Sequence, residues 1–138
     1  MKKELLALVG LGLLLATASA SAQTVPLKAN IPFNFIVNKA ELPAGEYTLK
    51  SLGSSDTVML IQSADGQMAK MVLPKACQSS KASTANKLVF HRYGSEYFLA
   101  QIWTAGYDQG KELPKSSRET EVAQDYPVQN VVLAATLR

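Results

Sequence analysis

Residues 88–103 read LVFHRYGSEYFLAQIW, and this stretch decides the fold. Two runs rich in aromatic and aliphatic residues flank a short Gly-Ser pair. Glycine at the first central position, here Gly94, is the residue that a two-residue type II′ hairpin turn requires. The stretch therefore predicts a tight antiparallel hairpin in which Arg92 lies opposite Tyr97.

Both faces of this predicted hairpin are apolar. Counting outward from the turn places Phe90 opposite Leu99 and Leu88 opposite Gln101, with Trp103 on the same side. The other side receives Val89, His91, Tyr93, Phe98, Ala100 and Ile102. A hairpin that is apolar on both faces belongs in the middle of a closed barrel or between two layers.

A second hairpin is predicted around the Asp-Gly pair at 65–66, the dipeptide that a two-residue type I′ turn prefers. This turn would place Leu60 opposite Met71 and Val58 opposite Leu73. All four side chains are apolar and share one face of the hairpin.

Further strands are predicted at 33–37 and 46–51, where the two faces alternate, and at 131–137, which supplies the last strand. Residues 74–87 show no periodicity and predict a surface loop. One short helix is expected at 116–123, because Ser116 and Glu119 have the spacing of a capping box, with Val122 and Ala123 as its buried candidates. The fold class is all-β: a small antiparallel β-barrel of seven or eight strands with one short helix, with a β-sandwich as the alternative.

The first residues have the layout of a secretory signal peptide, with Lys2 and Lys3 before an apolar run at 5–16 and small residues at 18–22. An apolar helix of this length is too short for a hydrocarbon core of about 30 Å. We therefore expect residues 1–22 to be a signal peptide, cut after Ala20 or Ala22, and residues 23–138 to form a single β domain. The protein would be exported, to the periplasm or the exterior, with no membrane span after cleavage.

Several segments together resemble a family of small exported β-rich proteins that is common among acidobacteria. They are Phe33-x-Phe35, residues 42–48 (LPAGEYT), 88–94 (LVFHRYG), 97–99 (YFL), Trp103 and 112–116 (ELPKS). The resemblance spans nearly the whole chain after the leader. It implies export and a compact β fold, and it transfers no activity and no catalytic residue.

The residues present argue against several functions. His91 is the only histidine, and no G-x-S-x-G motif supplies a nucleophile for it, so we expect no enzyme. One histidine and one cysteine cannot close a zinc site, and neither a metal nor a cofactor is predicted. The lysines are scattered, which disfavours nucleic acid. Cys77 cannot form an internal disulfide but could link a dimer, and the oligomeric state stays open.

The remaining candidate site lies on the first hairpin. Arg92, Tyr97 and Trp103 would offer a cation and two aromatic planes to an acidic or sugar-like ligand, with His91 as a fourth residue. Alternatively, Arg92 stacks on Tyr97 and Trp103 belongs to the core. The function predicted first is a non-enzymatic binding barrel for a small ligand. The alternative is a structural or interaction protein of the cell envelope that docks through an apolar sheet face.

Overall fold

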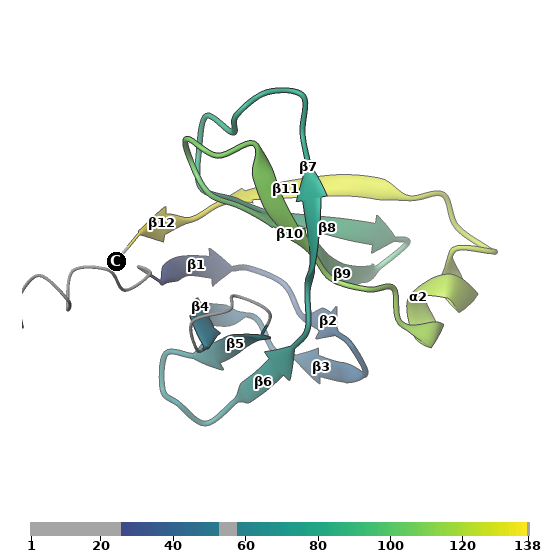
Figure 1. Cartoon of the computed structure of the whole chain (residues 1–138). Coiled ribbons are helices and arrows are strands. Elements are labelled where there is room, and N and C mark those ends of the chain that lie inside the picture. Colours follow the sequence, from purple (N-terminus) through teal and green to yellow (C-terminus); the bar gives the residue numbers. More distant parts are fainter. Residues whose placement is uncertain (1–25, 53–57, 138) are drawn as a thin grey trace, which may run out of the picture.

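The computed structural model describes residues 26–52 and 58–137, and this part is predominantly β with one short helix (Figure 1). The predicted signal peptide at 1–22 lies outside the described residues. The elements are β1 (Leu27–Ile31), β2 (Phe35–Val37), β3 (Ala40–Leu42), β4 (Gly45–Leu52), β5 (Val58–Ser63), β6 (Ala69–Val72), β7 (Lys75–Gln78), β8 (Lys87–Tyr93), β9 (Glu96–Trp103), β10 (Gln109–Glu112), α2 (Ser117–Val122), β11 (Gln129–Ala134) and β12 (Thr136–Leu137).

The strands form two sheets. The first sheet has the order β12-β1-β4-β5-β6, and the second has the order β11-β8-β9-β10-β7. Strand β2 joins the second sheet through a parallel bridge to β9 and an antiparallel pairing with β3. Every other pairing is antiparallel.

Neither sheet closes within the described residues, so the predicted barrel is wrong and the fold is sandwich-like. The reason lies at two corners where the chain changes sheets. Strand β6 continues through Leu73 and Pro74 into β7, and β11 continues through Ala135 into β12 (Figure 1). No ladder in the described residues pairs β6 with β7 or β11 with β12, so the two sheets stay open at these corners.

The inner faces of the two sheets share one core. Ile31 and Leu49 of the first sheet are buried in the same cluster as Leu88 and Phe90 of the second. Phe35 links the layers, because its ring makes edge contacts with Tyr47 at 5.1 Å and with Phe90 at 5.7 Å between ring centroids. Large rings therefore fill the space between the sheets.

The hairpin of β8 and β9 has the predicted register only near its turn. Arg92 lies opposite Tyr97 and Phe90 opposite Leu99, and Gly94 has the positive φ of 61° that the turn needs. A β-bulge then adds one residue to β9, so Leu88 lies opposite Ile102. The predicted pairing of Leu88 with Gln101 is wrong.

The bulge exchanges the two sides of β9 beyond Leu99. Ile102 joins Leu88 in the shared core, and Trp103, the next residue along the strand, therefore faces the opposite side of the sheet. The prediction that Trp103 lies on the same side as Phe90 and Leu99 is consequently also wrong.

The second hairpin, of β5 and β6, has the predicted pairing of Leu60 with Met71. Its turn is not type I′, because only Gly66 has a positive φ, 75°, whereas that turn needs two such residues. The Asp65 side chain accepts hydrogen bonds from Ser63 Oγ at 2.6 Å and from the Gln67 amide at 3.0 Å. These local bonds hold a different turn while keeping the register.

Two further elements differ from the sequence prediction. Strand β1 was not predicted, although Leu27, Ala29 and Ile31 are buried and alternate with polar residues. The expected loop at 74–87 contains the edge strand β7, which pairs with β10. The described residues therefore hold twelve strands rather than seven or eight. The helix is confirmed, with Ser116 as its N-cap.

Candidate functional site

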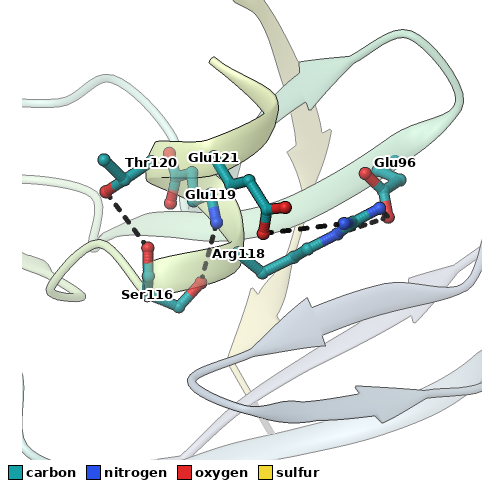
Figure 2. Close-up of polar contacts among 6 residues, drawn as sticks. All are labelled: Glu96, Ser116, Arg118, Glu119, Thr120 and Glu121. Atoms are coloured by element: carbon teal, nitrogen blue, oxygen red, sulfur yellow. Dashed lines mark hydrogen bonds and ion pairs between the residues drawn. The ribbon is translucent and has the colours of Figure 1, made fainter. Parts of the chain in front are cut away.

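Helix α2 begins at a capped N-terminus and carries a buried carboxylate. Ser116 Oγ accepts a hydrogen bond from the Glu119 amide at 3.1 Å, as the capping-box spacing predicts (Figure 2). The Glu119 side chain is turned to the β8–β9 hairpin instead of completing the box. Glu119 is 4% exposed and is the only buried charged residue in the part of the chain that the structure describes.

The carboxylate of Glu119 binds two side chains of β8. Its Oε2 accepts a hydrogen bond from the Tyr93 hydroxyl at 2.9 Å and lies 2.9 Å from Nδ1 of His91. Because a carboxylate oxygen can only accept, Nδ1 of His91 carries the proton. These contacts offset the cost of burying the carboxylate.

Burial and the neighbouring carboxylate raise the pKa of Tyr93 to about 12, because both disfavour the phenolate. Tyr93 also packs with Phe98 and Val122 in a small buried cluster between α2 and the outer side of the hairpin. Val122 is therefore a buried residue of the helix, as predicted, whereas Ala123 is exposed. The cluster and the Glu119 contacts together hold α2 on the sheet.

A carboxylate beside a histidine is part of the machinery of many hydrolases, which also need a nucleophile. Among the described residues, no serine, threonine or cysteine makes a hydrogen bond to His91. The contacts of Glu119 with His91 and Tyr93 therefore anchor helix α2 to strand β8.

A cavity of about 330 Å³ lies beside α2, between Tyr93 and Tyr126. One cation and three carboxylates line its wall, and Arg118 lies 2.9 Å from Glu96 and 3.8 Å from Glu121 (Figure 2). These pairs are partly exposed and each contributes little to stability. No buried side-chain polar atom in the described residues lacks a hydrogen-bond partner.

The four predicted site residues do not lie together. Arg92 and Tyr97 do meet, with the guanidinium carbon 5.4 Å from the ring centroid. Tyr97 in turn stacks on Phe33, with centroids 3.8 Å apart. His91 points to the opposite face of the hairpin, toward α2. The predicted contact between Arg92 and Tyr97 is therefore present. It is the stacked cation–π pair that was given as the alternative to a ligand site.

Trp103 lies away from Arg92 and Tyr97 and is buried against β10. Its Nε1 donates to Oε1 of Gln101 at 3.0 Å, and a Cβ on Gly110 would lie 2.7 Å from its ring. Gly110 is therefore the residue that allows the indole to cover the backbone of β10. Trp103 is therefore a buried residue, in agreement with the alternative prediction that it belongs to the core.

Exposed apolar side chains gather on the outer face of the β5–β6 hairpin. Its side chains are Val58, Leu60, Met71 and Leu73, which we call the outer hairpin face. Met71 is 58% exposed and Leu73 68% exposed. The alternate residues Met59, Ile61 and Val72 are buried in the core. The predicted pairing of Leu60 with Met71 is present, whereas Leu73 follows the end of β6 and has no ladder pairing with Val58.

Cys77 is half-buried on β7, where it lies opposite Gly110. Burial is the main cause that raises the pKa of its thiol, and the charge of Glu112 adds to it. The thiol is consequently protonated at neutral pH and weakly reactive. A link between two copies through Cys77 stays a prediction.

No protein-family model, no curated protein and no solved structure matches the chain. In the part that the structure describes, no helix is long and apolar enough to cross a membrane. The buried position of Glu119 is the feature that sequence reasoning missed. Its one signal was the apolar outer side of the β8–β9 hairpin, which needs a covering element with partners for His91 and Tyr93.

Proposed function

We propose that the protein is an exported, non-enzymatic interaction module that docks onto another protein of the cell envelope. The single observation that carries this proposal is the outer hairpin face, where Met71 and Leu73 are more than half exposed beside Val58 and Leu60. Contiguous apolar surface of this kind is typical of an interaction site. The leader pattern at 1–22 supports export.

The two open sheets favour docking over the enclosed ligand that was predicted first. A binding barrel holds its ligand in a lumen, whereas here the aromatic side chains of Phe35, Tyr47 and Phe90 are fully buried between the sheets. The outer hairpin face, in contrast, needs no rearrangement to meet a partner.

The surroundings of the outer hairpin face indicate the chemistry of the partner. Lys50 lies opposite Leu60, which lies opposite Met71, so a cation borders the apolar row. The next row toward the turn is polar, with Thr48 opposite Gln62. An apolar partner surface with an acidic residue at its rim would match this pattern.

Photocrosslinking in intact cells tests the proposal. A photoreactive amino acid at position 71 is expected to capture one defined envelope protein, and the same group at position 48 on the polar row is not. Leu73→Lys should abolish the capture, while Thr48→Lys should leave it unchanged. Equal capture at both positions, or capture that survives Leu73→Lys, contradicts the proposal. Recovery of the uncut chain from the cytosol contradicts export.

A further inference from the structure

Strand β11 differs in charge from the other strands that have an unpaired side. Within the described residues, β3, β6, β7, β11 and β12 each pair on one side only. Charged residues interrupt β3 with Glu41, β6 with Lys70 and β7 with Lys75, and β12 has only two residues. These are devices that protect sheet edges from pairing with another chain. Strand β11 has six residues and no charge.

The uncharged stretch extends beyond the strand itself. Residues 126–137 contain no Asp, Glu, Lys, Arg or His. Of the eight large hydrophobic residues that are exposed in the described part of the chain, four fall in this stretch: Tyr126, Val128, Val132 and Leu137, which are 49–57% exposed. Strand β11 is therefore a long, uncharged and apolar edge, the kind that pairs with a further strand.

We infer that β11 pairs antiparallel with β11 of a second copy of this chain, which joins the two second sheets into one. This proposal concerns a different edge from the outer hairpin face and does not depend on it. A second copy is favoured because identical strands without charge do not repel each other. A different partner would usually be selected by charge complementarity, which this edge cannot supply. Two-fold symmetry is also the commonest form of self-association.

The alternation of side chains restricts the register of this pairing. Val131 and Leu133 pack against the shared core, whereas Val132 is 57% exposed on the other face. Directly opposite residues in an antiparallel pair point to the same face. A two-fold axis perpendicular to the sheet leaves the core-facing side chains of both copies on the same face of the joined sheet. Neighbouring residues of a strand point to opposite faces and therefore cannot lie opposite each other. The axis must consequently lie at a residue and not between two residues.

Two positions of the two-fold axis can then be compared. An axis at Val132 places Val132 opposite its copy and Val131 opposite Leu133 of the copy, so that apolar residues meet on both faces. An axis at Val131 would place Asn130 opposite Val132 of the copy, and Gln129 opposite its Leu133. Since apolar cross-strand pairs stabilise a sheet, the geometry favours the axis at Val132.

Cysteine crosslinking tests this register in protein that is expressed as the full chain and purified after any cleavage of its signal peptide. With Cys77→Ser as the background, Val132→Cys is expected to form a disulfide-linked dimer under mild oxidation, because opposite Cβ atoms lie about 4.5–5.5 Å apart and small shifts bring them into bonding range. Ala76→Cys is the matched control, because Ala76 is also exposed and lies on β7, the edge strand at the other end of the same sheet. It should stay monomeric.

Sedimentation of the unmodified chain gives an independent measurement. We expect the mass of a dimer, and Val132→Lys should raise the dissociation constant at least about tenfold by placing like charges opposite each other. Unchanged circular dichroism would show that this variant still folds. A monomer at all concentrations, a complex that contains another protein at β11, or equal crosslinking at positions 76 and 132 would each overturn the inference. None of these outcomes depends on whether the outer hairpin face binds a partner.

Discussion

Replacing Glu119 by glutamine tests whether its carboxylate anchors α2. The carboxylate accepts from Tyr93 and lies beside Nδ1 of His91, both at 2.9 Å. Hydrogen bonds to a charged group contribute about 1.5–3 kcal/mol each. Glutamine can keep an oxygen at the position of Oε2, which both side chains contact, but it loses the charge that strengthens these hydrogen bonds. We therefore expect Glu119→Gln to lower the free energy of unfolding by about 2 kcal/mol, roughly half of the gross contribution.

Urea unfolding followed by circular dichroism measures this change. With a slope of about 1–3 kcal/mol per molar urea, the midpoint should fall by roughly 1 M. Glu121→Gln is the matched control, because Glu121 lies two positions further along the same helix and its side chain is 71% exposed. That variant should shift the free energy of unfolding by less than about 0.5 kcal/mol.

A double-mutant cycle with Tyr93→Phe separates the Tyr93 contact from the His91 contact. If the hydroxyl of Tyr93 bonds to Glu119, the two substitutions together should cost less than the sum of the single effects, by about 1 kcal/mol. Equal midpoints for Glu119→Gln and Glu121→Gln would refute the anchoring role.

Three further predictions follow from other contacts. Because the pKa of Tyr93 is raised to about 12 in the folded state, the unfolded chain loses this proton first, and stability should fall from pH 10 to pH 12 by on the order of 2 kcal/mol; urea titrations at both pH values should show a smaller fall in Tyr93→Phe. Gly110→Ala should destabilise the fold by about 1–3 kcal/mol and change the tryptophan fluorescence, because its Cβ would lie 2.7 Å from the Trp103 ring; an unchanged emission spectrum would contradict this packing. Arg92→Ala should cost less than about 1 kcal/mol, since a partly exposed cation–π contact is weak, and a larger loss in thermal unfolding would indicate a further role for Arg92.

The sequence allowed accurate prediction where the chemistry is local. Gly94 and the Asp-Gly pair at 65–66 set the registers of both hairpins near their turns. The bulge in β9 could not be predicted from alternation, because both faces of that hairpin are apolar. A slip of one residue exchanges Ile102 and Trp103 without placing a charge in the core. The pattern therefore carries no contrast that would reveal it.

Long-range features escaped prediction for a different reason. Ser116 and Glu119 correctly indicated where the helix begins. The burial of Glu119 depends instead on its contact with Tyr93 of strand β8, which is distant from the helix in sequence. In the same way, alternation predicted many of the strands but not which strands lie at the corners between the sheets. The choice of sandwich over barrel depends on strand order, which single-strand patterns do not encode.

The corner at Ala135 has a consequence for the order of folding. Strand β12, just beyond this residue, pairs with β1 at the opposite end of the described chain, through Leu27 with Leu137 and Lys28 with Thr136. Synthesis proceeds from the N-terminus, so β1 leaves the ribosome long before its partner strand exists. One flank of β1 therefore stays without a neighbour until residues 136–137 have been synthesised. Nascent chains of this protein should consequently remain sensitive to protease until the last strand has emerged.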